Sequence, residues 1–91
     1  AGAALRAFLA ERFPADRPVR FLDLACGDAD TTAKALAGRR LGRYVGVDRS
    51  PDALAAAAQM VAGLDGATEF VTADFLDNLE TTPDTFDAIY V

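Results

Sequence analysis

Ten residues near the start of the chain decide its fold. Residues 21–30 read Phe21-Leu22-Asp23-Leu24-Ala25-Cys26-Gly27-Asp28-Ala29-Asp30. An apolar run that contains one acid passes into a turn of small residues, and the residues after that turn can begin a helix. Such a turn lets a ligand approach the backbone closely, with the free N–H groups of the helix facing it. The stretch therefore predicts the first strand, the turn and the following helix of an α/β domain.

Outward from this stretch, strands and helices alternate along the chain. Short apolar segments rich in β-branched or aromatic residues predict strands at Val19–Leu24, Arg43–Val47, Glu69–Thr72 and Phe86–Val91. The segments between them predict helices at Ala3–Arg12, Asp30–Ala37 and Ser50–Leu64. Ser50 suits the N-cap, Pro51 the first helical position and Gly38 a C-terminal stop. Strands that alternate with helices imply right-handed crossovers and a parallel sheet.

Length and charge restrict the classes of protein that fit. The 91 residues predict one small domain over residues 1–91, with a formal net charge of −5 and no histidine. No apolar run approaches the ~20 residues that span a bilayer. For that reason we expect no membrane partner. The acidic balance disfavours binding to phosphate backbones, so we also expect no nucleic-acid partner. Cys26 has no second cysteine to pair with, which fits the cytoplasm.

The last residues bear on whether the chain is a whole domain or part of one. Val91 falls inside or just after an apolar strand, with no turn or cap behind it. An edge strand left unpaired would be a liability for aggregation. We therefore expect the chain to be part of a longer protein, truncated after the fourth strand.

Acidic residues follow three of the predicted strands or lie within them. Asp48 ends the segment Tyr44-Val45-Gly46-Val47 and lies 25 residues beyond Asp23, while Asp74 follows Thr72-Ala73. An acid at the tip of the second strand can accept hydrogen bonds from both hydroxyls of a ribose, and bonds to charged groups contribute roughly 1.5–3 kcal/mol each. The pattern predicts a nucleoside site at the carboxyl edge of the sheet.

Together these residues resemble the class I S-adenosylmethionine-dependent methyltransferases, whose first motif reads D-L-G-C-G-x-G. The resemblance extends from Val19 to Val91. It implies a Rossmann-like doubly wound parallel sheet in the order 3-2-1-4, with S-adenosyl-L-methionine as cofactor and transfer of its methyl group to a nucleophilic acceptor. We expect a small-molecule acceptor. The residues of this segment show no metal site, and no catalytic residue is assigned among them.

The resemblance also assigns roles to individual residues. It implies cofactor contacts from Asp23, Ala25, Cys26, Gly27, Asp48, Arg49, Asp74 and Phe75. The turn passes under the methionine part, Asp48 holds the ribose, and Asp74 contacts the adenine amino group with Phe75 beside the ring. A supporting role for Asp23 is as compatible with the pattern as direct contact. The assignment requires the Asp48 side chain to face Gly27.

Two residues depart from the family pattern. Ala25 and Ala29 stand where the family usually has glycine. Alanine disfavours a positive φ and adds a methyl group where the cofactor passes closely. Alanine is the mildest such replacement, so weaker cofactor binding is compatible with the pattern and loss of binding is not implied.

Two other functions share parts of this pattern. An NAD(P)-dependent oxidoreductase would also show a strand-turn-helix and a second-strand acid, but Asp28 and Asp30 would repel its pyrophosphate. A non-catalytic cofactor-binding module is the third reading, and Ala25 and Ala29 motivate it.

Several residues also have plain structural readings. Asp28 or Asp30 can cap the helix that follows them, Cys26 is expected to pack as a thiol, and Asp87 is expected to be structural. Core positions are expected for Phe8, Leu9 and Phe13. A solvated edge is expected for Arg39, Arg40 and Arg43.

Overall fold

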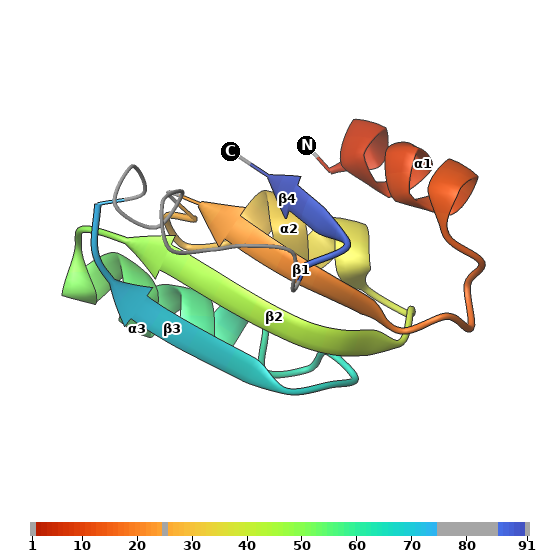
Figure 1. Cartoon of the computed structure of the whole chain (residues 1–91). Helices are drawn as coiled ribbons and strands as arrows, with labels where there is room; N and C mark the ends of the chain where they lie inside the picture. Colours follow the sequence, from red (N-terminus) through yellow and green to blue (C-terminus); the bar gives the residue numbers. More distant parts are fainter. Residues whose placement is uncertain (1, 25, 75–85, 91) are drawn as a thin grey trace.

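The four strands form one parallel sheet. The computed structural model describes residues 2–24, 26–74 and 86–90, with strands β1 (Val19–Leu24), β2 (Leu41–Asp48), β3 (Thr68–Thr72) and β4 (Ala88–Tyr90). The strand order is β3-β2-β1-β4, and every neighbouring pair is parallel (Figure 1). The predicted α/β class and the predicted order 3-2-1-4 are therefore confirmed. Parallel strands place all their carboxyl ends at the same edge of the sheet.

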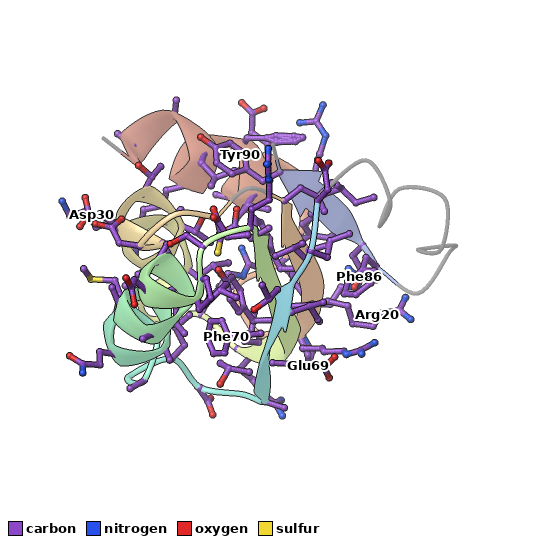
Figure 2. All side chains as sticks on the ribbon, turned by 90° about the vertical axis from the view of Figure 1, so that its left-hand side faces the viewer. Arg20, Asp30, Glu69, Phe70, Phe86 and Tyr90 are labelled. Atoms are coloured by element: carbon purple, nitrogen blue, oxygen red, sulfur yellow. The ribbon has the colours of Figure 1, made fainter. Side chains whose placement is uncertain are left out.

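Three helices pack on one face of this sheet. They are α1 (Ala3–Arg12), α2 (Asp30–Leu36) and α3 (Pro51–Met60). Their apolar residues join side chains from β1 and β2 in one core cluster, whose largest members include Leu9, Leu36, Val61, Phe21 and Tyr44. Figure 2 views the sheet from its side, with Phe70 toward the helices and Phe86 and Arg20 on the opposite side.

The opposite face carries a second apolar cluster. Leu22 and Leu24 of β1 alternate with Phe21 and Asp23, and Val45 and Val47 of β2 lie beside them. All four aliphatic side chains are buried. The strands are thus apolar on both faces, as the absence of a long polar alternation predicts for a parallel sheet.

The start of β2 and the end of α3 differ from the prediction. Strand β2 begins at Leu41 rather than Arg43, because Leu41 pairs with Val19 and its N–H bonds to the Asp65 carbonyl oxygen at 2.8 Å. Helix α3 ends at Met60 rather than Leu64. The residues after Met60 form a turn that brings Asp65 beside the start of β2. In both cases contacts between distant segments decide the boundary, and local propensity does not report them.

Helix α1 and strand β1 have the predicted bounds, and the ends of the other elements differ by one or two residues. Helix α2 stops at Leu36, and Gly38 follows with a φ of 82°, as its predicted role as a stop requires. Strand β3 begins one residue early, at Thr68, and β4 covers 88–90. Ser50 caps α3, with its Oγ accepting from the Ala53 N–H at 3.2 Å, and Pro51 is the first helical residue. In the last connection, Pro83 and Asp84 disfavour a long helix, and both lie outside the described residues.

The core prediction for α1 is partly wrong. Leu9 is buried and Phe13 packs against the core, but Phe8 is 39% exposed. The Arg12 guanidinium lies over the Phe8 ring, 3.9 Å from its centroid. A ring with a cation on its face tolerates this partly solvated position.

Candidate functional site

The turn after β1 lies at the carboxyl edge of the sheet. The Cys26 N–H donates to the Val47 carbonyl oxygen at 2.9 Å, which continues the β1–β2 pairing past the end of β1. Gly27 and Ala29 then adopt left-handed conformations, with φ of 55° and 62°. A turn here lies beside the point where strand order reverses between β1 and β4, the place where open α/β sheets bind ligands.

The Asp48 carboxylate lies directly beside this turn. Its Oδ2 accepts from the Gly27 N–H at 2.9 Å, and its Oδ1 accepts from the Ser50 N–H at 2.9 Å. These backbone donors stabilise the anion and lower the pKa of Asp48, with the Ser50 bond first among the causes. A carboxylate has about four lone-pair sites, so two more hydrogen bonds can be accepted. The predicted orientation of Asp48 toward Gly27 is confirmed.

Asp23 lies beneath the turn rather than in the open. Only 2% of its surface is exposed, and its Oδ2 accepts from the Tyr44 hydroxyl at 2.7 Å. Burial raises the pKa of Asp23, while the hydroxyls of Tyr44 and Thr32 bond to the carboxylate and oppose that rise. This placement fits the supporting role better than direct contact with a ligand.

Cys26 is a packing residue in this structure. Its side chain is half-buried, and its thiol donates to the Gly27 carbonyl oxygen at 3.5 Å. Burial first, and then the nearby Asp23 and Asp48 carboxylates, raise the pKa of the Cys26 thiol to about 11. The thiol is therefore protonated at neutral pH, whereas the form of cysteine that attacks as a nucleophile is the thiolate.

Ala29 differs from the expectation in one respect. It does adopt a positive φ, but its surface is only 2% exposed and it belongs to the core cluster on the helix side. The expectation of a methyl group in the path of the cofactor is therefore wrong for Ala29, because that methyl points into the core. Ala25 lies outside the described residues.

The two acids that follow Gly27 have different partners. The Asp28 carboxylate accepts from the Asp30 N–H at 3.1 Å, at the beginning of α2. Asp30 is the first helical residue, and its carboxylate pairs with Lys34 at 3.0 Å. Neither acid is the N-cap residue of α2, which is Ala29 with no side-chain cap hydrogen bond. Asp28 nevertheless satisfies the free N–H of Asp30, while the Asp30 carboxylate pairs with Lys34 instead.

Two further predicted site residues, Arg49 and Asp74, lie near Asp48. Arg49 is exposed and follows Asp48 directly, so its charge also lowers the pKa of that acid. Asp74 is half-buried just beyond β3, whose end is held to β2 by the bond from the Ala73 N–H to the Asp48 carbonyl oxygen at 3.0 Å. Phe75 lies outside the described residues. The structure thus brings Gly27, Asp48 and Asp74 to one edge.

Tyr44 is not among the residues that the sequence predicted for the site. Its hydroxyl lies beneath the turn, against Asp23 of β1 and Cys26 of the turn. Its side chain is fully buried, and burial together with the neighbouring Asp23 charge raises the pKa of Tyr44 above its usual range. One signal was available in the sequence. Glycine inside a strand marks a close approach, and Gly46 lies two residues after Tyr44, on the same face.

Asp87 lies at the opposite edge of the sheet, where the strands begin. Its carboxylate accepts from the Arg20 backbone and guanidinium at 2.9 and 3.1 Å and from Arg17 at 3.2 Å. These bonds, those to Arg20 first, hold the pKa of Asp87 well below its usual range. The structural reading of Asp87 agrees with this geometry.

The clustered arginines are mostly engaged with other parts of the chain. Arg39 donates to the carbonyl oxygens of Phe13 and Pro14 at 3.2 and 2.8 Å, and Arg43 pairs with Glu69 at 3.3 Å. Arg40 is exposed.

One cavity of the described residues is lined by neither Asp48 nor Asp74. It measures about 770 Å³ and lies between α1 and β4, with Leu5, Phe8, Tyr90 and Ile89 among its walls. Within residues 2–24, 26–74 and 86–90, no group of three His, Cys, Asp or Glu side chains could hold a metal ion. No helix of this described part is long and apolar enough to cross a membrane.

Comparison with known proteins identifies a family. A family model described as "Methyltransferase domain" matches residues 21–91, from β1 to the last residue. The matched segment includes the turn at Gly27, Asp48 and Asp74. No curated protein matches the chain.

Proposed function

Because the chain belongs to the methyltransferase domain family, we propose that its methyl donor is S-adenosyl-L-methionine, bound at the carboxyl edge of the sheet. The observation that carries this proposal is the contact between Asp48 and the Gly27 N–H. This contact places an ionised acid from the tip of β2 against the turn that follows β1. In the proposal, Asp48 accepts hydrogen bonds from the ribose hydroxyls through its remaining lone pairs.

The other predicted residues extend the proposed site in both directions from Asp48. The turn at 26–29 would pass beneath the methionine part, and Asp74 would face the adenine end. The donor supplies a methyl group on a positively charged sulfur. Asp48 and Asp74 would orient the adenosyl group so that this methyl faces the acceptor, and such alignment lowers the barrier of an in-line displacement.

The charge around the turn favours this donor over a dinucleotide. Asp28 and Asp30 both lie at the beginning of α2, and Asp30 is only partly neutralised by its exposed pair with Lys34. A pyrophosphate at this helix would meet two carboxylates. The methyl donor has no phosphate, and its ammonium and sulfonium groups are compatible with nearby anions.

The acceptor is part of the proposal as well. We propose a small molecule, because a net charge of −5 opposes binding to nucleic acid. The free thiol of Cys26 fits a reducing compartment such as the cytoplasm.

Titration calorimetry on the intact protein tests the donor. S-adenosylhomocysteine is expected to bind and NADH is not. Tighter binding of NADH would favour the oxidoreductase reading. If neither S-adenosylmethionine nor S-adenosylhomocysteine binds at millimolar concentration, the non-catalytic module is favoured.

The Asp48→Asn variant tests the residue that carries the proposal. Replacing the charged acceptor of two ribose hydroxyls is expected to weaken S-adenosylhomocysteine binding by about ten- to a hundredfold, since bonds to charged groups contribute roughly 1.5–3 kcal/mol. Asp52→Asn is the matched control, because Asp52 is an exposed acid in the first turn of α3. Equal affinities for Asp48→Asn and the control would contradict the assigned role.

A further inference from the structure

The buried Tyr44 hydroxyl lies at the junction of β1, β2 and the turn. It donates to Asp23 Oδ2 at 2.7 Å, and both side chains are almost entirely excluded from solvent. The phenol also contacts the Cys26 thiol, and the two groups affect each other's ionisation. One hydroxyl therefore supports the last part of β1 and the first residue of the turn.

The sheet leaves room for this hydroxyl by placing a glycine above it. Gly46 pairs with Asp23 in the β1–β2 register, and a Cβ on Gly46 would lie 3.1 Å from the Tyr44 hydroxyl oxygen and 3.2 Å from Cys26 Sγ. Contacts this close are rarely tolerated without a shift of the neighbour. The Tyr44 ring also lies between two aromatic neighbours, Phe21 of β1 with 6.2 Å between ring centroids and Phe70 of β3 with 5.9 Å. Its position is thus fixed on both sides.

From these contacts we infer that Tyr44 is a positioning residue for the proposed donor site, acting through Asp23 and Cys26 on the turn that meets Asp48. This inference rests on the proposed function. The series of contacts is short: the Tyr44 hydroxyl lies against Cys26 beside Gly46, Cys26 precedes Gly27, and the Gly27 N–H bonds to Asp48. Loss of the hydroxyl would loosen the turn without removing any group that touches the donor.

The groups around Asp23 show that the Tyr44 phenol affects the ionisation of the Asp23 carboxyl. Tyr44 faces it from β2, Thr32 from α2, Tyr90 from its register position on β4, and Cys26 from the turn. Asp48 contributes a second negative charge near Cys26. Tyr44 and Thr32 are the hydroxyls that bond to the Asp23 carboxylate in the described part of the chain. Removing either one disfavours the charged form of Asp23.

The Tyr44→Phe variant of the intact protein is the test, because it removes one oxygen and keeps the stacked ring. Binding of S-adenosylhomocysteine is expected to weaken about five- to tenfold, the effect of one lost hydrogen bond. The acid limb of the affinity-against-pH profile is expected to move to higher pH, because the Asp23 carboxyl holds its proton more tightly. A residue with only a packing role would not move this limb.

Two further variants make the outcome specific. Val61→Ala removes buried apolar volume at the end of α3, away from the turn, and is expected to lower stability while leaving affinity and its pH profile unchanged. In an Asp23→Asn background, Tyr44→Phe is expected to cause little further loss of affinity. Equal losses in both backgrounds would overturn action through Asp23.

The remaining outcomes separate this inference from the proposed function. Failure of the wild-type protein to bind S-adenosylhomocysteine would overturn the proposed function. Wild-type binding with an unchanged Tyr44→Phe affinity and pH profile would overturn the role of Tyr44 alone. If Tyr44→Phe does not fold, 3-fluorotyrosine at position 44 gives a second readout. Its ¹⁹F resonance is expected to shift when S-adenosylhomocysteine binds, and an unmoved resonance would also contradict the inference.

Discussion

At the scale of single residues, Ala29 shows how a departure from a motif is accommodated. A left-handed φ costs a non-glycine residue roughly 1–2 kcal/mol. The Ala29 methyl group is buried among core side chains, and burial of one such group contributes about 0.8 kcal/mol. The alanine also loses less chain entropy on folding than glycine would, by about 0.4–1 kcal/mol. The strain and these two gains are of similar size.

The Ala29→Gly variant is therefore expected to change the free energy of unfolding by less than about 1 kcal/mol. Ala33→Gly is the matched comparison, because Ala33 is buried in the middle of α2, where glycine brings no relief of strain. That variant is expected to lose about 1.5–2 kcal/mol from helix propensity and the buried methyl group. Urea unfolding of both variants measures the difference. A large loss for Ala29→Gly would mean that its φ of 62° carries little strain.

At the scale of elements, the attachment of β4 depends on one carboxylate. Strand β4 is three residues long and pairs only with β1 in the described part of the chain. Just before it, Asp87 bonds to the backbone and side chain of Arg20 at the beginning of β1 and to Arg17 in the preceding loop. The Asp87 side chain is 10% exposed, so water screens these bonds only partly. This contact fixes β4 in the sheet at the end opposite to the donor site.

Asp87→Ala is expected to lower the free energy of unfolding by about 2–3 kcal/mol, because it leaves several donors without their charged acceptor. Glu69→Ala removes a carboxylate from an exposed pair with Arg43 and is expected to cost less than about 1 kcal/mol. Chemical denaturation measures both values. Hydrogen exchange adds a local readout: the amide protons of β4 should lose protection in Asp87→Ala. Equal costs for the two variants would contradict the role assigned to Asp87.

At the scale of the whole molecule, acids with opposite pKa shifts shape the dependence of stability on pH. The pKa values of Asp48 and Asp87 are lowered by folding, so their contribution is complete above the unfolded value of about 3.9 and is lost as pH falls below it. The pKa of Asp23 is raised by burial. Its folded state binds a proton more tightly than its unfolded state, so Asp23 favours folding more strongly as pH falls from neutrality toward about 4.

Unfolding free energies between about pH 3 and 8 test these opposite signs. Relative to the wild type, Asp23→Asn is expected to lose the gain in stability between neutrality and about pH 4. Asp87→Asn is expected to show its largest deficit at neutral pH. The deficit should shrink below about pH 4, because Asp87 takes up a proton there in the unfolded wild-type chain while the folded carboxylate stays ionised. A deficit of Asp87→Asn that is the same at every pH would contradict the assigned shift.

Much of the fold followed from local patterns in the sequence. Alternating strands and helices specified a parallel sheet, and Ser50, Pro51 and Gly38 punctuated the helices as predicted. The first two residues of β2 were missed, since Leu41-Gly42 has little strand propensity and is held by partners distant in sequence. The same reason explains Phe8: the helical spacing groups it with Leu9, but the packing of α1 on the sheet leaves it at the edge.

The sequence by itself determined which chemical groups are available and where along the chain they occur: small residues after the first strand and acids at the strand ends. It could do so because strand period and turn chemistry are local properties. The tertiary structure alone decided which of these groups meet. It directed Asp48 to the Gly27 N–H and enclosed Asp23 beneath Tyr44, because hydrogen bonds across the sheet and burial in its core depend on the register between strands.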